Sequence, residues 1–273
     1  MYSRINDPFS QFSNAADTYD TSYSADGHGF AETLANMHLG SDASSSSSRS
    51  YSLVDQPPVV EISKRSFAKK AEAFYGDNIK HIADNPQVYS PRISSKAKLV
   101  KKVAKKYGNT KDTEHARYFS YQLGNTSVGL LRTEGGCKMS DEFEGDQWQK
   151  AFPGRTEVTS TVDLQIAHPL VVNAGDILLE YQLQLDGDRA LLRTRPANDE
   201  ARARSRELGF VEVDDDNMVL DPTQHPDKWT KNYDGKWQRA DKPTRYLSKA
   251  ESSDSENETA NVLSRSDDDY DFM

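Results

Sequence analysis

The chain contains one cysteine, Cys137, so it cannot form a disulfide within itself. This usage is typical of proteins that work in a reducing compartment. No stretch approaches the roughly 18 consecutive apolar residues that a membrane-spanning helix needs, so we expect no membrane span. The first residues also lack the basic start and apolar centre of a cleavable signal peptide. If the protein leaves its cell, we therefore expect a route that does not use such a signal.

Hydrophobic residues make up only 35% of the sequence, less than in an average globular protein. Part of the chain is therefore expected to be unfolded. The six histidines are scattered and no second cysteine accompanies them, so the sequence predicts no metal site. A net charge of −9 argues against a general nucleic-acid-binding protein.

The two ends of the chain differ in composition from its middle. Residues 1–50 are rich in Ser, Asp, Asn, Thr and Gly, and residues 248–273 repeat this pattern with acids. Such segments bury too little apolar surface to offset the entropy of ordering, so we predict that both are disordered. The expected organisation is a Ser-rich secretion segment over 1–50, a folded core with a C-terminal extension over 51–247, and an acidic tail over 248–273.

Hydrophobic periodicity within the core predicts an α/β protein. The expected order is a strand near residue 59, two helices, three strands, a helix, a strand, a helix and two strands. Ser90 and Pro91 are typical of the N-cap and first position of the second helix, and Gly124-Asn125 is typical of a hairpin turn. Residues 134–156 are predicted to be a long loop. This succession predicts a mixed central sheet with helices on both faces.

The spacing of several residues in the second half is that of a known cofactor motif. Gly175 follows Pro169, and Ser205 lies four residues before the pair Gly209-Phe210. Together with the order of elements, this spacing resembles the GCN5-related N-acetyltransferase (GNAT) superfamily over residues 55–222. The superfamily has Gln or Arg at the position of Val172, Gly or Ala at that of Ile177, and Tyr at that of Ser205. The resemblance implies acetyl-coenzyme A as cofactor, while these departures favour a core that has lost its activity.

The resemblance also implies which residues would form a site. A helix start binds pyrophosphate through free N–H groups, and the candidates here are Asn173, Ala174, Gly175, Asp176, Ile177 and Asn198. Asp163, on the central strand, is the candidate base, and Ser205 stands where the acid would be. Asn173 and Asp176 are also typical of a helix cap with an acidic first turn, and a carboxylate there would repel the pyrophosphate. We predict that this cap closes the helix end without a ligand.

Charges outside this region suggest contacts with other proteins. The second predicted helix places Lys98, Lys101, Lys102, Lys105 and Lys106 opposite its apolar side. Residues 61–106 as a whole carry twelve Lys and Arg against four acids, a balance of +8, while residues 251–273 carry eight acids against one Arg, a balance of −7. A solvated helix face is the favoured interpretation of the lysines, and an acidic partner is the alternative.

Serines near acids or proline are candidates for phosphorylation. Ser253, Ser255, Ser264 and Ser266 each have an acid three residues later, and Ser90 precedes Pro91. Serines in an unfolded segment are accessible to kinases without any unfolding step. Chance matches in a low-complexity tail are the alternative.

Over most of its length the chain resembles a family of rhizobial type III secretion effectors, nodulation outer protein P. The resemblance is based on the opening residues 1–9, the core motifs and the aromatic stretch from Trp229 to Trp237. It implies delivery by the type III secretion machinery into the cytoplasm of legume cells, phosphorylation by host kinases, possible recognition by a plant immune receptor, and an influence on nodulation, host range and defence signalling. The function expected is a secreted effector acting through protein interactions, and the alternative is an acetyl-CoA-dependent N-acetyltransferase that modifies host proteins.

Overall fold

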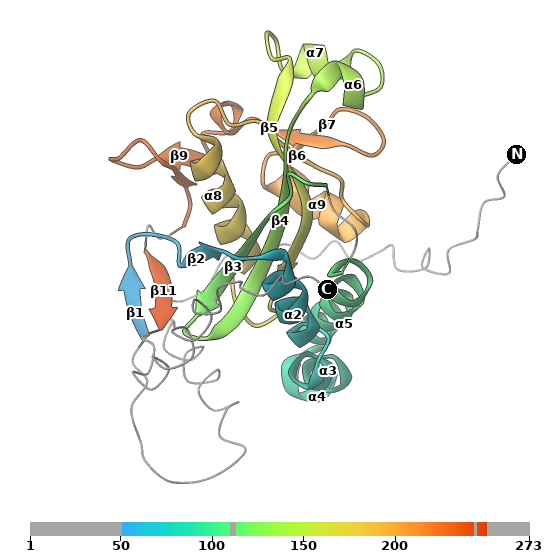
Figure 1. The fold of residues 1–273 in the computed structure, drawn as a ribbon, viewed down its shortest axis with the longest axis vertical. Coiled ribbons are helices and arrows are strands. Elements are labelled where there is room, and N and C mark those ends of the chain that lie inside the picture. Colours follow the sequence, from blue (N-terminus) through green and yellow to red (C-terminus); the bar gives the residue numbers. More distant parts are fainter. Residues whose placement is uncertain (1–50, 110–112, 243–244, 250–273) are drawn as a thin grey trace, which may run out of the picture. The chain divides into compact units, whose positions relative to one another are not determined.

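A seven-stranded mixed sheet forms the centre of the described chain (Figure 1). The structure is a computed structural model, and it describes residues 51–109, 113–242 and 245–249. In spatial order the strands are β2 (Val59–Glu61), β3 (Arg117–Leu123), β4 (Thr126–Lys138), β5 (Glu157–Ala167), β6 (Leu192–Thr194), β8 (Met218–Leu220) and β7 (Val211–Glu212). β5 and β6 are parallel, and every other neighbouring pair in this sheet is antiparallel. This mixed sheet was predicted from the order of the elements.

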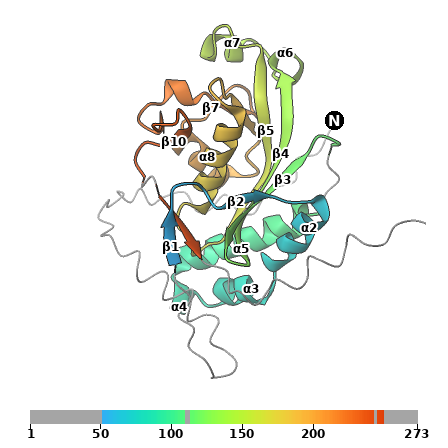
Figure 2. The same cartoon turned by 60° about the vertical axis from the view of Figure 1, so that its left-hand side comes forward.

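One face of the sheet is covered by helices from the first half of the chain (Figure 2). They are α2 (Lys64–Ala73), α3 (Asp77–Asp84), α4 (Pro86–Tyr89) and α5 (Pro91–Tyr107). Phe67 and Phe74 of α2 pack with Leu130 of β4 and Leu164 of β5, which lie on that face because alternate strand residues point the same way. The first of the two helices expected here is broken at Gly76, which is the N-cap of α3.

The opposite face is covered by α8 (Ala174–Asp186), and α9 (Asp199–Glu207) follows β6. Gly129 of β4 makes room for α8, because a Cβ at this position would lie 2.9 Å from a methyl of Leu178. The predicted arrangement of helices on both faces is therefore confirmed. None of the helices in the described ranges is long and apolar enough to cross a bilayer.

The long loop predicted over residues 134–156 is wrong. β4 continues to Lys138, and two short helices follow, α6 (Met139–Glu142) and α7 (Gln147–Ala151). The helices bury large apolar side chains against the sheet, so this segment has a small core of its own. Its members include Met139, Phe143, Trp148 and Phe152.

A C-terminal extension, residues 222–249, packs onto α8. It contains a 3-10 turn, η1 (Pro222–Gln224), and a two-stranded sheet of β9 (Trp229–Lys231) and β10 (Trp237–Arg239). The indole nitrogen of Trp237 donates to the carbonyl of Gly187 at the end of α8, at 2.9 Å. The last strand, β11 (Tyr246–Lys249), pairs with β1 (Tyr51–Val54), so the two ends of the described chain meet (Figure 1). The core boundary predicted at residue 247 falls inside β11, so residues 248 and 249, predicted to belong to the acidic tail, are part of a strand. The predicted segment 1–50 and residues 250–273 lie outside the described residues.

Candidate functional site

The parallel strands β5 and β6 separate at the edge where α8 begins. They pair only between Ser160–Val162 and Leu192–Thr194, although β5 continues for five more residues. The backbone of residues 163–167 therefore has no partner strand on the β6 side. This opening, with the first turn of α8 at its end, is the place where the sequence motif predicts a cofactor.

The first turn of α8 is not closed by the predicted cap. Asn173 is the N-cap residue, but it adopts a left-handed conformation with φ of 61° and its side chain makes no capping hydrogen bond. The carboxylate of Asp176 instead turns toward α9, where its Oδ2 lies 2.6 Å from Nη2 of Arg204. Asp176 is only 6% exposed. The capping prediction is thus wrong in its mechanism, since an ion pair between two helices engages the carboxylate.

Arg204 is shared between two carboxylates. Its Nη1 lies 2.7 Å from Oε2 of Glu207, which is half exposed on the same helix. Although burial lowers the pKa of Arg204, Asp176 and Glu207 together raise it above its usual value. A permanent cation therefore neutralises Asp176 at the start of α8.

The remaining cofactor candidates are occupied by internal contacts or lie away from the helix start. The carbonyl of Gly175 accepts from Nε2 of Gln165 on β5, at 2.6 Å, which ties the helix to the strand. Ala174 and Ile177 are buried in the core. Asn198 caps a different helix, because its Oδ1 accepts from the N–H of Ala201 in α9. A buried, ion-paired carboxylate in the first turn does not suit a pyrophosphate.

The candidate base, Asp163, is also held in an ion pair. It is the extra residue of a β-bulge, since Arg132 of β4 is opposite Leu164 and Thr133 is opposite Val162. Nε and Nη2 of Arg132 lie 2.6 and 2.5 Å from Oδ2 of Asp163. The arginine therefore engages one oxygen, Oδ2, of the carboxylate proposed as the base.

The candidate acid, Ser205, serves the end of α9 through its backbone. Its carbonyl accepts from the N–H groups of Leu208 and Phe210, at 3.1 and 3.0 Å. Within the described residues, Ser205 shares no hydrogen bond with Asp163. The structure therefore gives Ser205 a clear role in the helix end and offers no proton path between the two.

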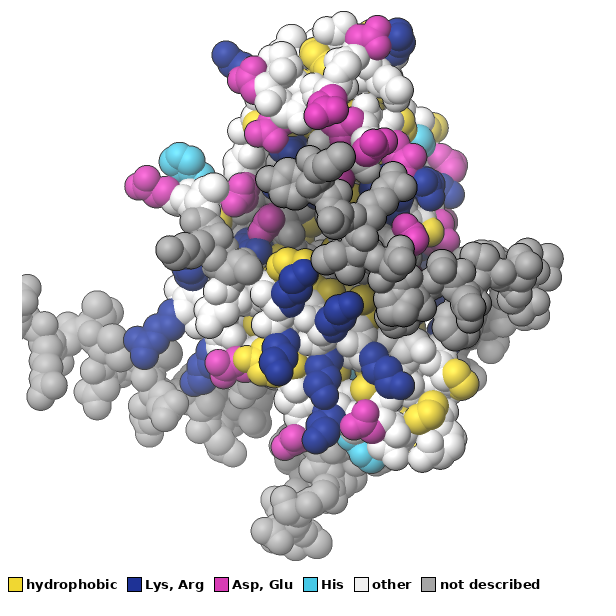
Figure 3. All heavy atoms as spheres, turned by 90° about the vertical axis from the view of Figure 1, so that its right-hand side faces the viewer, with side chains coloured by type: hydrophobic (Ala, Val, Ile, Leu, Met, Phe, Trp, Pro, Cys, Tyr) yellow, Lys and Arg dark blue, Asp and Glu magenta, His cyan; other side chains and the backbone are white. Residues whose placement is uncertain are grey.

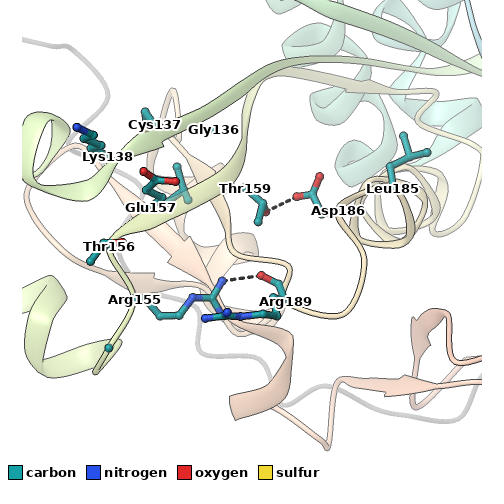
Figure 4. A pocket seen from close by; sticks show the side chains of 12 residues that line it. Gly136, Cys137, Lys138, Arg155, Thr156, Glu157, Thr159, Leu185, Asp186 and Arg189 are labelled. Carbon is teal, nitrogen blue, oxygen red and sulfur yellow. Dashed lines mark hydrogen bonds between the residues drawn. The ribbon is translucent and has the colours of Figure 1, made fainter.

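A hollow of about 730 Å³ lies at the other end of β5, where α8 ends (Figure 4). Arg155 and Arg189 meet on one side of it, and Nη2 of Arg155 donates to the carbonyl of Arg189 at 2.6 Å. Asp186, on another side, accepts from the hydroxyls of Thr159 and Ser160 at 2.5 and 2.6 Å. Sequence reasoning missed this hollow, because its walls come from β4, β5, α8 and the loop after α8.

Cys137 lines the same hollow but lacks the partner that a nucleophile needs. Its sulfur accepts from Nη1 of Arg193 at 3.5 Å. Nδ1 of His168 instead accepts from the Leu170 N–H at 3.3 Å. Burial lowers the pKa of His168 to about 4, so its ring is neutral at ordinary pH. No metal cluster of three or more His, Cys, Asp or Glu side chains occurs in the described ranges.

The order of helices and strands defines an α/β core built on a mixed seven-stranded sheet, and comparison with known proteins places the chain in a particular family. It belongs to the family described as nodulation outer protein P, whose model matches residues 52–250. The chain is 53% identical over 252 residues to "Effector protein NopP" of Sinorhizobium fredii, with 92% of each chain covered. It is 52% identical over 219 residues to "Host-inducible protein A" of Rhizobium fredii, covering 79% of this chain and 73% of the relative.

Solved structures of acetyltransferase type show a more distant similarity. One is titled as a histone acetyltransferase HPA2 and related acetyltransferase from Corynebacterium glutamicum. It shares 15% identity and a TM-score of 0.31, with 60% of this chain and 94% of that chain covered. The fold is defined by the strand order above and not by this similarity.

Proposed function

We propose that this chain is a secreted effector that enters legume cells through a type III secretion system and acts there by binding host proteins. The names of the two relatives, an effector protein and a host-inducible protein, support this role. Residues 1–50 are the proposed export segment. The proposed partners are host kinases that act on Ser90 and the C-terminal serines, and a plant immune receptor. The outcomes that we propose for these contacts are changes in nodulation, host range and defence signalling.

In this proposal the acetyltransferase-like core is a binding scaffold and not an enzyme. The observation that carries this step is the ion pair between Asp176 and Arg204 in the first turn of α8. A pyrophosphate bound there would meet a carboxylate, and the cation that could attract it is already neutralised. The ion pair of Asp163 with Arg132 supports the same conclusion, because the candidate base is engaged as well.

The alternative is an acetyl-CoA-dependent N-acetyltransferase acting on host proteins. One observation favours it, namely the opening between β5 and β6. The unpaired backbone of residues 163–167 offers hydrogen-bonding groups to an extended, amide-containing ligand. Under this alternative, Asp163 would have to leave Arg132 to act as a base.

Calorimetric titration with acetyl-CoA distinguishes the two functions. For the scaffold we expect a dissociation constant weaker than about 1 mM, a binding free energy weaker than about −4 kcal/mol. Replacing Asp176 by Asn removes the carboxylate from the first turn and leaves Arg204 paired only through Nη1 with Glu207, so its Nη2 becomes available to a phosphate. One charge-assisted hydrogen bond contributes about 1.5–3 kcal/mol, so binding should tighten roughly 10- to 100-fold.

Glu207→Gln is the matched control for this titration. It removes the second carboxylate from the same arginine but leaves Asp176 in the first turn, so acetyl-CoA binding should stay weak. Tight binding by the natural chain, together with host-protein lysine acetylation that Asp163→Asn abolishes, would establish the enzyme instead.

Export is tested with a chain that begins at Tyr51. Because residues 1–50 have no core-forming pattern, its thermal unfolding should match that of the full chain. Secretion in culture should be lost. Secretion at the normal level would refute the proposed role of this segment.

A further inference from the structure

A dense basic face covers the helices on one side of the sheet. We call it the basic face, and its members on α2 are Lys64, Arg65, Lys69 and Lys70, while those on α5 are Arg92, Lys96, Lys98, Lys101, Lys102, Lys105 and Lys106. These four and seven cations make eleven, against the single acid Glu72. Figure 3 shows Lys and Arg side chains gathered on this side of the molecule. Like charges at this density repel one another.

The basic face lacks carboxylates to balance it. Apart from Lys64, none of its members has an ion pair with a described residue, although arginines elsewhere pair readily. Burial lowers the pKa of Lys70, and no neighbouring acid raises it. The charge of this face is therefore available to an acidic segment, whereas the carboxylates of the core are each paired with an arginine.

The same chain contains an acidic segment of suitable charge and reach. Residues 251–273 carry a balance of −7 and begin two residues after the end of β11 at Lys249. β11 contacts β3, and β3 contacts α2, so the segment starts one strand away from the helices of the basic face. An extended chain spans about 3.3 Å per residue, so 23 residues can reach across both helices.

We propose that residues 251–273 dock on the basic face, where they compete with acidic host partners for the same lysines. Attachment to the same chain gives the segment an effective concentration on the order of 1 mM, which favours it over a dilute partner. Each phosphate added to its serines contributes about −1.5 to −2 charges and strengthens the contact. Phosphorylation of the tail thus strengthens the contact with the lysines, and removal of the phosphates weakens it.

Zero-length cross-linking with a carbodiimide tests the contact in the full chain, because it joins only carboxylates and amines that touch. At low salt we expect cross-links between acids of residues 251–273 and lysines of α2 and α5. The Debye length falls from about 30 Å at 0.01 M to about 3 Å at 1 M salt, so the yield should drop at least about tenfold over this range. A mixture of ¹⁵N-labelled and unlabelled chains separates contacts within a chain from those between chains.

Charge reversal identifies the partners of the contact. Changing Lys98, Lys102 and Lys105 together to Glu should abolish the cross-links, and so should changing Asp267–Asp269 to Lys. Combining both changes should restore the cross-links, now between the new carboxylates of α5 and the new amines of the tail. As the matched control, reversal of three exposed lysines outside the face should leave the cross-links unchanged; these are Lys138, Lys150 and Lys236.

Three results would overturn the proposal. They are low-salt cross-links that form only between labelled and unlabelled chains, tail cross-links that survive the reversal on α5, and a failure of the combined variant to regain them. The first would assign the basic face to a second copy of the chain. Circular dichroism of each variant checks that the fold is intact, which we expect because the changed lysines are exposed.

Discussion

Replacing Arg239 by Ala removes the charge that holds the C-terminal extension onto α8. Nε of Arg239 lies 2.7 Å from Oε2 of Glu180, and these side chains are 5% and 1% exposed. The hydroxyl of Tyr246 donates to the other carboxylate oxygen. Removing one partner of a buried pair leaves the other charge uncompensated in a medium that solvates it poorly. The variant should therefore lose about 3–5 kcal/mol of unfolding free energy.

A loss of this size is large against the total stability of about 5–15 kcal/mol that is usual for a protein. Urea unfolding, followed by tryptophan fluorescence and by circular dichroism, measures this loss of unfolding free energy. The two signals distinguish unfolding of the extension from unfolding of the sheet. The matched control is Arg117→Ala, which breaks a pair of similar geometry with Glu61 at 3.0 and 2.8 Å. Those side chains are 47% and 50% exposed, so this control should lose no more than about 1 kcal/mol.

The effect of Arg239→Ala should also depend on pH. Burial raises the pKa of Glu180 above its usual value despite the attraction of Arg239, and loss of the arginine raises this pKa further. An acid with a raised folded pKa contributes stability that is lost as pH rises from its unfolded value through its folded value. The penalty of the variant should thus be large at pH 8 and smaller near pH 5. An equal loss at both values, or a loss no greater than in the control, would refute the buried-charge argument.

Three further substitutions test buried groups elsewhere. Burial raises the pKa of Tyr121 to about 12, so the natural chain should lose stability as pH rises from 10 toward 12, and Tyr121→Phe should flatten this loss in alkaline urea titrations. His168 has its pKa lowered to about 4, so its contribution is lost as pH falls from 6.5 through 4, and acid unfolding of His168→Gln should be less steep. Gly129→Ala places a Cβ 2.9 Å from Leu178, so thermal unfolding should show a loss of about 1–3 kcal/mol from overpacking; an unchanged melting curve would contradict this.

The sheet and its main helices were predictable because their patterns are local. Alternation at Val158, Val162, Leu164 and Ile166 marks β5, and the Ser90-Pro91 pair marks the start of α5, where the Ser90 hydroxyl accepts from the Ile93 N–H. The bulge at residue 163 was not predicted, because one inserted residue leaves the alternation on either side intact.

The segment after β4 could not be predicted in this way. α6 and α7 have four and five residues, too few for a helical period to show. Their apolar side chains are separated by Gly, Asp and Glu, which are typical of loops. Burial of Phe143, Trp148 and Phe152 depends on β5, β7 and β8, and only the tertiary structure brings these strands together.

The partners of the charges at the candidate site were not predicted from the sequence. The cap predicted at Asn173 and Asp176 followed from a spacing of three residues, whereas the observed partner, Arg204, is 28 residues further on. Likewise Arg132 is 31 residues before Asp163. Ion pairs between elements leave no periodic signal in a single sequence, so local rules assign such carboxylates to caps or solvent.

The charges of this protein divide into two groups that should respond differently to salt. Asp163, Asp176 and Glu180 each pair with an arginine from another element, and at least one side chain of each pair is buried, so screening by salt is weak. Apart from Lys64, the cations of the basic face have no ion pair with another described residue. Their electrostatic attraction is therefore available to acidic segments and is strongly screened by salt. We therefore expect the unfolding free energy to change little between about 0.05 and about 0.5 M salt. Over the same range, binding of acidic host partners should weaken steeply.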